Sequence, residues 1–268
     1  MRDRSLAVLF MVAAGTVSGG CFDSTTVLRV GGTGAGTLQQ RTIVKKAALA
    51  QLRSFGGAGG GRASLDPLSE DQARALASSL GPGTVLVSST VINTADGEGR
   101  ESTYSFPDVS QLHVSEQPAA PGDVAIHTPG LNTDSPAITL SLTRTPEGNA
   151  VLHIVVPPLA LFAGPDGSGG VNPAVIQQLQ ALRGVLAGAH LLVAVEPLGR
   201  LVRTSSPYVD GQRVTLLEVD LDRVLGDPTL VPRLQAAKTL DEIRAIVRDA
   251  PGLKINLDPD ITVEFAPQ

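Results

Sequence analysis

Cys21 is the residue whose chemistry the sequence supports best. It is the only cysteine of the chain, and it follows a short leader. Residues 1–4 carry net positive charge, residues 6–17 are mainly apolar, and residues 18–20 are small. This order is typical of an export signal. A cysteine directly after the small residues predicts a lipoprotein signal peptide over residues 1–20, cleavage before Cys21 and acylation of the Cys21 thiol.

Two other interpretations of the leader compete with this one. A transmembrane helix needs about twenty apolar residues, and the apolar run is too short for that. An ordinary secreted protein with a free thiol is the second alternative, because Ser18 stands where lipoproteins usually have leucine. A lone thiol is a liability in an oxidising compartment. We therefore expect an exported protein, lipid-anchored to a membrane of the cell envelope and facing the periplasm or the outer surface.

The histidines and serines do not form a recognisable catalytic or metal-binding pattern. None of His113, His127, His153 and His190 belongs to a helix-spaced pair or to an H-E-x-x-H motif. No serine lies in a G-x-S-x-G elbow. The sequence thus predicts no catalytic residue, no metal site and no cofactor, and we expect that the protein is not an enzyme.

Aspartates gather in the C-terminal third of the chain, at positions 220, 222, 227, 258 and 260. A calcium loop requires closely alternating oxygen ligands and a late glutamate. Here Val224 and Leu225 interrupt the series. Helix capping and turn formation are the simpler explanation of these aspartates.

Arg41, Lys45 and Lys46 predict a small basic patch near the expected anchor. Such a patch could touch anionic headgroups. The alternative is a solvated helix face, since we expect a short helix to begin at Lys45.

The composition excludes several classes of partner. The formal net charge is −5, and removal of Arg2, Asp3 and Arg4 with the leader changes it to −6. Nucleic-acid binding requires clustered basic side chains, so no nucleic-acid partner is expected. The chain has no tryptophan and only two tyrosines, which disfavours sites that stack sugars or bases. With one cysteine, the fold cannot rely on internal disulfides.

Short turns between strand-like segments predict an α+β fold. We expect a mostly antiparallel sheet of about ten strands packed with four to five helices. Capping boxes at 69–72 and 239–242 predict two helix starts. Strands at 200–205 and 213–221 should be joined by a turn as antiparallel neighbours, and strands at 254–257 and 261–265 should close the chain as a hairpin.

The expected division of the chain has three parts. Residues 1–20 form the signal peptide, and residues 21–24 form a lipidated N-terminal tether. Residues 25–268 form a single α+β envelope domain with a flexible glycine-rich loop at 56–62.

The segment 209–215 reads V-D-G-Q-R-V-T, a V-x-G-x-x-V-T hairpin pattern. Together with the cysteine after the leader, an early glycine-turn hairpin, Y-S-F-P-D at 104–108 and G-L-K at 252–254, it resembles the LppM-like group of poorly characterised bacterial envelope lipoproteins. The resemblance covers most of the chain. It implies an envelope location, an α+β fold and a bias toward lipid-like ligands, and it implies no catalytic residue.

Three functions remain open from the sequence. The first is a membrane-anchored, non-enzymatic interaction or assembly module of the cell envelope, which binds the membrane through Cys21 and has an envelope protein as partner. The second is a carrier or sensor of a lipid-like apolar ligand. Its site would be lined by aliphatic residues such as Leu140, Val155, Leu179, Leu182 and Val193. The third is a hydrolase with an unusual site.

Overall fold

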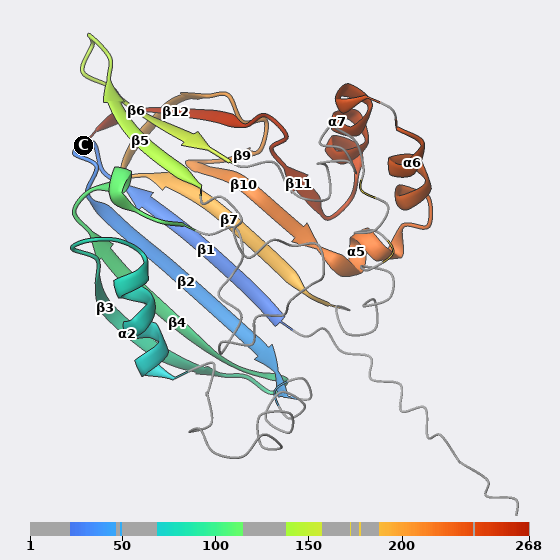
Figure 1. Cartoon of the computed structure of the whole chain (residues 1–268), viewed down its shortest axis with the longest axis horizontal. Coiled ribbons are helices and arrows are strands. Elements are labelled where there is room, and N and C mark those ends of the chain that lie inside the picture. The colour runs from blue at the N-terminus through green and yellow to red at the C-terminus, as the bar shows by residue number, and fades with distance from the viewer. Residues whose placement is uncertain are drawn as a thin grey trace, which may run out of the picture.

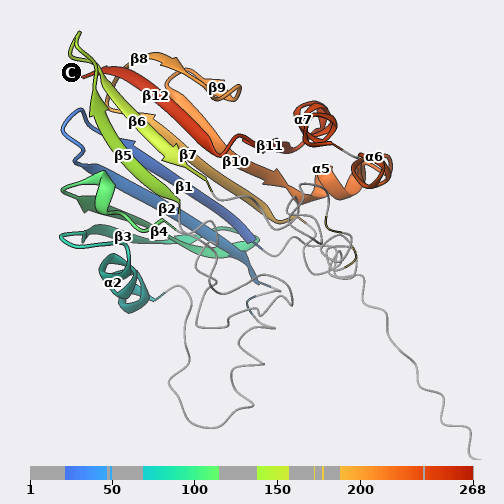
Figure 2. The ribbon, with the colours of Figure 1, turned by 45° about the horizontal axis from the view of Figure 1, so that its top comes forward.

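The computed structural model of the chain describes residues 22–46, 49, 69–114, 138–156, 172, 177, 188–237 and 239–267. Within these ranges the fold is α+β, with twelve strands and four α-helices. The strands form one sheet of eight and one of four, and the smaller sheet lies across one face of the larger (Figures 1 and 2).

The large sheet is ordered β11-β10-β7-β1-β2-β4-β3, and β9 pairs with β10. All of its neighbouring strands are antiparallel except β1 and β7, which run parallel with Asp23 opposite His190. Its strands are β1 (Phe22–Val30), β2 (Gly36–Lys45), β3 (Val85–Asn93), β4 (Gly97–Phe106), β7 (His190–Pro197), β9 (Val209–Asp210), β10 (Arg213–Asp220) and β11 (Leu253–Ile255).

The small sheet is antiparallel throughout and is ordered β5-β6-β12-β8. Its strands are β5 (Thr139–Arg144), β6 (Ala150–Val155), β8 (Gly199–Thr204) and β12 (Asp260–Pro267). β8 follows β7 after a single residue, so the chain passes from the large sheet to the small one at Leu198.

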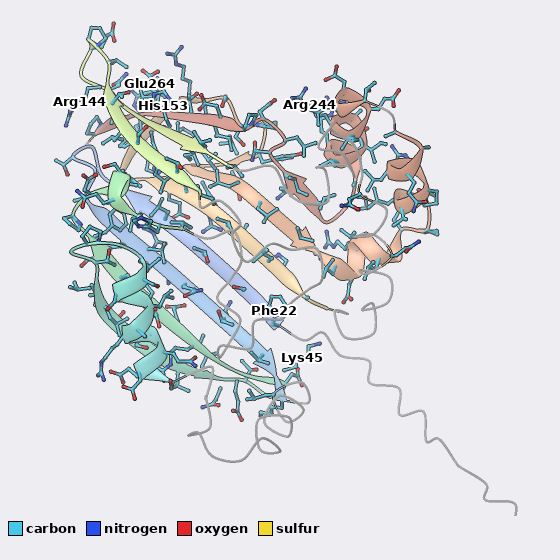
Figure 3. The ribbon with its side chains drawn as sticks, in the orientation of Figure 1. Phe22, Lys45, Arg144, His153, Arg244 and Glu264 are labelled. Carbon is cyan, nitrogen blue, oxygen red and sulfur yellow. The ribbon has the colours of Figure 1, made fainter. Side chains whose placement is uncertain are left out.

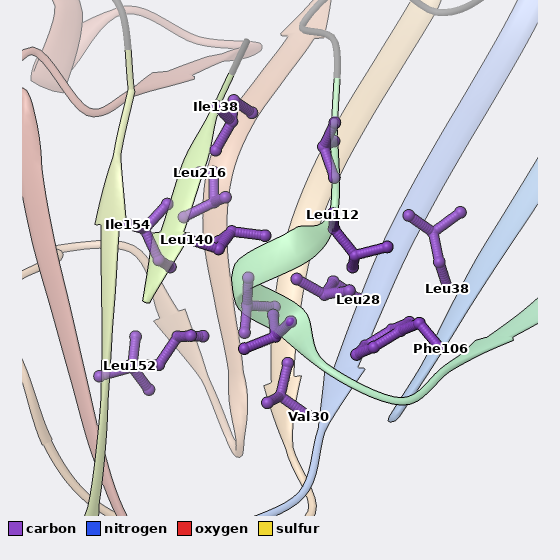
Figure 4. Packing of buried hydrophobic residues seen from close by; sticks show 14 of the residues in the cluster. Leu28, Val30, Leu38, Phe106, Leu112, Ile138, Leu140, Leu152, Ile154 and Leu216 are labelled. Carbon is purple, nitrogen blue, oxygen red and sulfur yellow. The ribbon is translucent and has the colours of Figure 1, made fainter. Parts of the chain in front are cut away.

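The main core lies between the two sheets because alternate residues of each strand point toward the other sheet. Leu28, Val30 and Phe106 of the large sheet meet Leu152 and Ile154 of the small sheet in one buried cluster (Figure 4). The short 3-10 turn η1 (Val109–Gln111) adds Val109 to the same cluster.

The helices pack at the two ends of the large sheet. α2 (Glu70–Ser79) lies along the edge strand β3, whereas α6 (Leu230–Ala236) and α7 (Leu240–Asp249) form a second core with β10 and β11 (Figure 1). α5 (Leu221–Gly226) directly continues β10. The capping boxes begin their helices as predicted, since Ser69 accepts a hydrogen bond from Gln72 N and Thr239 accepts one from Glu242 N.

Several sequence predictions need correction. The described residues form twelve strands rather than about ten, and β9 is the strand that the sequence did not predict. The two last strands do not form a hairpin: β11 pairs with β10 in the large sheet, and β12 pairs with β6 and β8 in the small one. β8 and β10 are likewise in different sheets. Their hydrophobic patterns fitted strands, but local sequence could not reveal which sheet each strand joins.

Residues 22–24 were predicted to belong to the N-terminal tether. β1 begins at Phe22, so residues 22–24 are part of the large sheet. The signal peptide, Cys21 and the glycine-rich loop at 56–62 lie outside the described residues.

Candidate functional site

The end of the large sheet that follows Cys21 is built from the start of β1 and the end of β2. Phe22 lies opposite Val44 in the strand register, and both contact Leu49. Figure 3 shows Phe22 and Lys45 together at this end of the sheet. An acyl chain on Cys21 would therefore be attached one residue away from a rigid strand. No helix in the described part of the chain is long and apolar enough to span a membrane.

The basic residues near this end do not gather as the predicted patch requires. The Lys46 Nζ donates hydrogen bonds to the carbonyl oxygens of Thr94 and Ala95, at 3.0 and 3.1 Å. It thereby holds the β3–β4 hairpin. Arg41 lies in the middle of β2, opposite Glu101 of β4. Lys45 is the last residue of β2 and belongs to no helix.

A row of polar side chains crosses four neighbouring strands on the face of the large sheet that points away from the small sheet. We call this face the outer face. The Arg29 Nη1 donates to Gln39 Oε1 at 2.8 Å, and the Arg29 Nε donates to Glu196 Oε2 at 2.9 Å. The Arg213 Nε donates to Glu196 Oε1 at 2.8 Å. This first row runs Gln39–Arg29–Glu196–Arg213 over β2, β1, β7 and β10.

The carboxylate of Glu196 is held in its charged form. Partial burial alone would raise the pKa of Glu196, but the hydrogen bond and charge of Arg213, together with Arg29, outweigh burial and lower this pKa below its ordinary value. Because both carboxylate oxygens pair with guanidinium groups, Glu196 is poorly placed to act as a general base.

A second row on the outer face lies nearer to Cys21. The Lys254 Nζ is 2.8 Å from Glu218 Oε2, His190 Nε2 is 4.0 Å from Glu218 Oε1, and His190 Nδ1 is 3.5 Å from Asp23 Oδ1. This second row runs Asp23–His190–Glu218–Lys254 over β1, β7, β10 and β11. Charge alternates in sign along the first row, and the second row adds two carboxylates and the ammonium group of Lys254 to the same face.

An open groove of about 480 Å³ lies beside the first row. Arg29, Glu196 and Arg213 form one side, and the turn at 197–199 with Asp210 and Gln212 forms the rest. Three of its charged side chains, Arg29, Glu196 and Arg213, are paired with one another. Such a surface is suited to polar contacts with another macromolecule.

The small sheet carries a comparable group on its own exposed face. Glu264 is 7 % exposed, and it accepts hydrogen bonds from Asn149 Nδ2 at 2.8 Å and from Arg203 Nε at 2.5 Å. The hydrogen bond from Asn149 has the largest effect on the pKa of Glu264, and the one from Arg203 has the next largest. Together they outweigh burial and lower this pKa. Figure 3 shows Glu264 and His153 on this sheet.

The structure keeps the described histidines apart. His113 follows η1 and is exposed, His153 lies 3.3 Å from the Thr143 hydroxyl on the small sheet, and His190 belongs to the second row. His127 lies outside the described residues. In the described ranges, no group of three or more His, Cys, Asp or Glu side chains is placed to hold a metal ion.

The C-terminal aspartates cap and brace local structure. Asp220 accepts a hydrogen bond from Arg223 N at the start of α5, and Asp227 accepts two from Thr229. Asp258 accepts one from Arg244. The capping and turn interpretation is confirmed for Asp220 and Asp227.

Three of the residues proposed to line an apolar ligand cavity belong to the described part of the chain. Leu140 and Val193 are buried in the main core, and Val155 is 46 % exposed because it points away from that core. Leu179 and Leu182 lie outside the described residues.

Comparisons with known proteins place the chain in no family. No family model matches it, and no curated protein matches it. A solved structure with some similarity is the folded domain of LppM from Mycobacterium tuberculosis. The two are 11 % identical, and the match covers 76 % of this chain and 85 % of that chain with a TM-score of 0.32. The match names the same group as the sequence resemblance, but at this TM-score it carries no argument about fold or function.

Proposed function

We propose that this chain is an exported, lipid-anchored protein of the bacterial envelope that acts as a non-enzymatic interaction module. The observation that carries the proposal is the pair of charged rows on the outer face of a sheet whose first strand starts one residue after Cys21. An anchor so close to a strand would hold that face at a fixed orientation to the membrane.

The proposed partner is an envelope protein with a polar, charged contact surface. Alternating charges favour a complementary surface and disfavour mismatched ones, so they supply specificity more than affinity. The groove beside the first row would receive a projecting side chain or loop of that partner.

The anchor is tested by fractionation of cells that express the full-length chain. We expect the wild-type protein in the membrane fraction, released only by detergent, and the Cys21→Ser variant in the soluble or secreted fraction, because loss of the thiol removes the acylation site. Ser18→Ala is the matched control and should stay in the membrane fraction. A soluble wild-type protein would refute the anchor.

The binding face is tested by photo-crosslinking in intact cells. A photoreactive residue at Thr103, on the outer face, should give discrete protein adducts, and one at Ser141, on the exposed face of the small sheet, should not. Equal adducts from both positions would remove the outer face from the proposal. A lipid-mass adduct in native mass spectrometry of the purified protein, lost on denaturation, would instead support a carrier.

A further inference from the structure

The edge strand β3 differs from every other sheet edge in the described residues. Edge strands expose unpaired backbone groups, and proteins commonly protect them by shortness, charge or proline. β11 has three residues and carries Lys254, β8 carries Arg200 and Arg203, and β5 ends at Arg144. β3 has nine residues, V-L-V-S-S-T-V-I-N, with no charge and no proline.

The side chains of β3 are unusually apolar for an exposed strand. Val85, Val87 and Val91 are 55 %, 61 % and 55 % exposed. Over the described ranges, β3 pairs with β4 alone. Within the described residues, no strand pairs with the outer edge of β3, whose register with β4 shifts between Leu86 and Ser88. The strand therefore offers a free edge and apolar side chains to an additional strand.

Helix α2 makes a groove with this edge. Figures 1 and 2 both show α2 beside β3. An open space of about 420 Å³ lies between them, lined by Glu70, Arg74 and Ala77 of α2 and by residues 84–89, which are the first part of β3 and the residue before it. The small side chain of Ala77 leaves the helix close to the strand without filling the space. A groove between a strand edge and a helix is suited to a single extended segment.

We propose that an extended peptide segment of a partner protein adds as a strand to β3 and lies in the groove between β3 and α2. Main-chain hydrogen bonds to β3 would supply affinity, and alternate side chains would enter the groove. This inference goes beyond the proposed function and depends neither on the anchor at Cys21 nor on the charged rows. The strand-addition proposal can therefore fail while the proposed function holds, and the reverse is also true.

The flanking helix and the local charge identify the occupant. Strands in a sheet lie about 4.8 Å apart, so one strand needs little room beside β3. A second copy of this chain would bring its own α2 to the same edge, which disfavours edge-to-edge pairing of two copies at residues 85–89. The first turn of α2 carries Glu70 and Asp71 against Arg74, which pairs with both. The surplus negative charge, at Asp71 beside the groove, favours one basic residue in the segment. The apolar side chains of β3 and the strand geometry favour uncharged, β-branched residues in the rest of it.

The probe is a synthetic library of hexapeptides. Each member has lysine at its first position and valine, isoleucine, threonine or serine at each of the remaining positions. Binding to the detergent-purified protein is measured by fluorescence anisotropy, and the contact is located by hydrogen exchange. We expect members that bind and slow exchange in β3 and α2. Val87→Lys should weaken that binding by about tenfold or more, because charge and bulk enter the groove. Val155→Lys, at a valine of similar exposure on the small sheet, should leave it unchanged.

Backbone methylation of a bound hexapeptide tests strand addition itself. Successive amides of a strand point to opposite sides, so only every second amide of the bound peptide faces β3. Methylation of the amides that face β3 should abolish binding, and methylation of the amides that face away should not. The proposal is overturned if no member binds, if Val87→Lys has no effect, or if both methylated sets bind equally. Protection of β3 that rises with protein concentration, without peptide, would assign the edge to a second copy and would also overturn it.

Discussion

At the scale of single residues, the sheet faces are organised around carboxylates that are fully paired. Glu196 is held by two arginines from neighbouring strands, and Glu264 is held by Asn149 and Arg203. In both cases the folded chain favours the charged form and lowers the pKa. These groups bind strands together and define the polarity of the faces.

The pairing of Glu196 predicts a pH-dependent contribution to stability. Because its pKa is lower in the folded chain, its stabilisation is present above the unfolded pKa of about 4.3 and is lost as the pH falls through the folded pKa. Glu196→Gln should lower the free energy of unfolding by about 1 kcal/mol at pH 7. That difference should shrink toward zero in acid.

Urea unfolding of both proteins between pH 7 and pH 3 measures the Glu196 effect. Glu147→Gln, in the exposed turn between β5 and β6, is the control and should differ little from wild type. A difference for Glu196→Gln that stayed constant over this pH range would show that the charged form of Glu196 is not what stabilises the fold.

At the scale of elements, the β1–β2 hairpin depends on close approach of its backbone. A Cβ atom at Gly36 would lie 2.0 Å from the carbonyl oxygen of Arg29 and 2.7 Å from the ring of Phe106. Neither neighbour can move easily, because Arg29 is part of the β1–β2 strand pairing and Phe106 is packed in the main core. The first strand pair can therefore form in this register only with glycine at position 36.

Gly36→Ala should destabilise the protein by about 2 kcal/mol or more, because the backbone of β1 must shift. Gly226→Ala is the matched control, since a Cβ there meets nothing within 4 Å, and it should change stability by less than about 1 kcal/mol. Thermal unfolding followed by circular dichroism compares the two. Equal melting temperatures for both variants would contradict the steric argument.

Local signals predicted elements well and their partners poorly. Ser69 and Thr239 begin helices where the capping boxes placed them, and the β1–β2, β3–β4 and β5–β6 hairpins follow from their turns. The sheet assignment of β11 and β12 was wrong because nothing local records the long-range partner. The first row was missed for the same reason, since Arg29 and Glu196 are 167 positions apart.

At the scale of the whole molecule, two sheets share one core. Leu152 is fully buried on β6 and packs within the cluster that joins both sheets, whereas Val155 on the same strand points away from it. The sandwich therefore depends on alternate residues of a few strands.

Leu152→Ala should cost about 2–5 kcal/mol, from lost burial and the cavity left behind. Val155→Ala should cost less than about 1 kcal/mol, because its side chain is already in solvent. Urea unfolding at neutral pH measures both. If the two substitutions proved equally mild, the packing of the small sheet on the large one would be much looser than its buried cluster indicates.

The parallel pairing of β1 with β7 has a consequence for the order of folding. The β1–β2 and β3–β4 hairpins come from residues 22–106, but β7 begins only at residue 190. A chain that emerges with its N-terminus first can close these hairpins early, and contacts so distant in sequence form slowly. Until residue 197 has emerged, β1 is itself an open edge. The free edge of β1, which pairs with β7 at the centre of the finished sheet, is thus the place where a nascent chain is most exposed to pairing with the wrong strand.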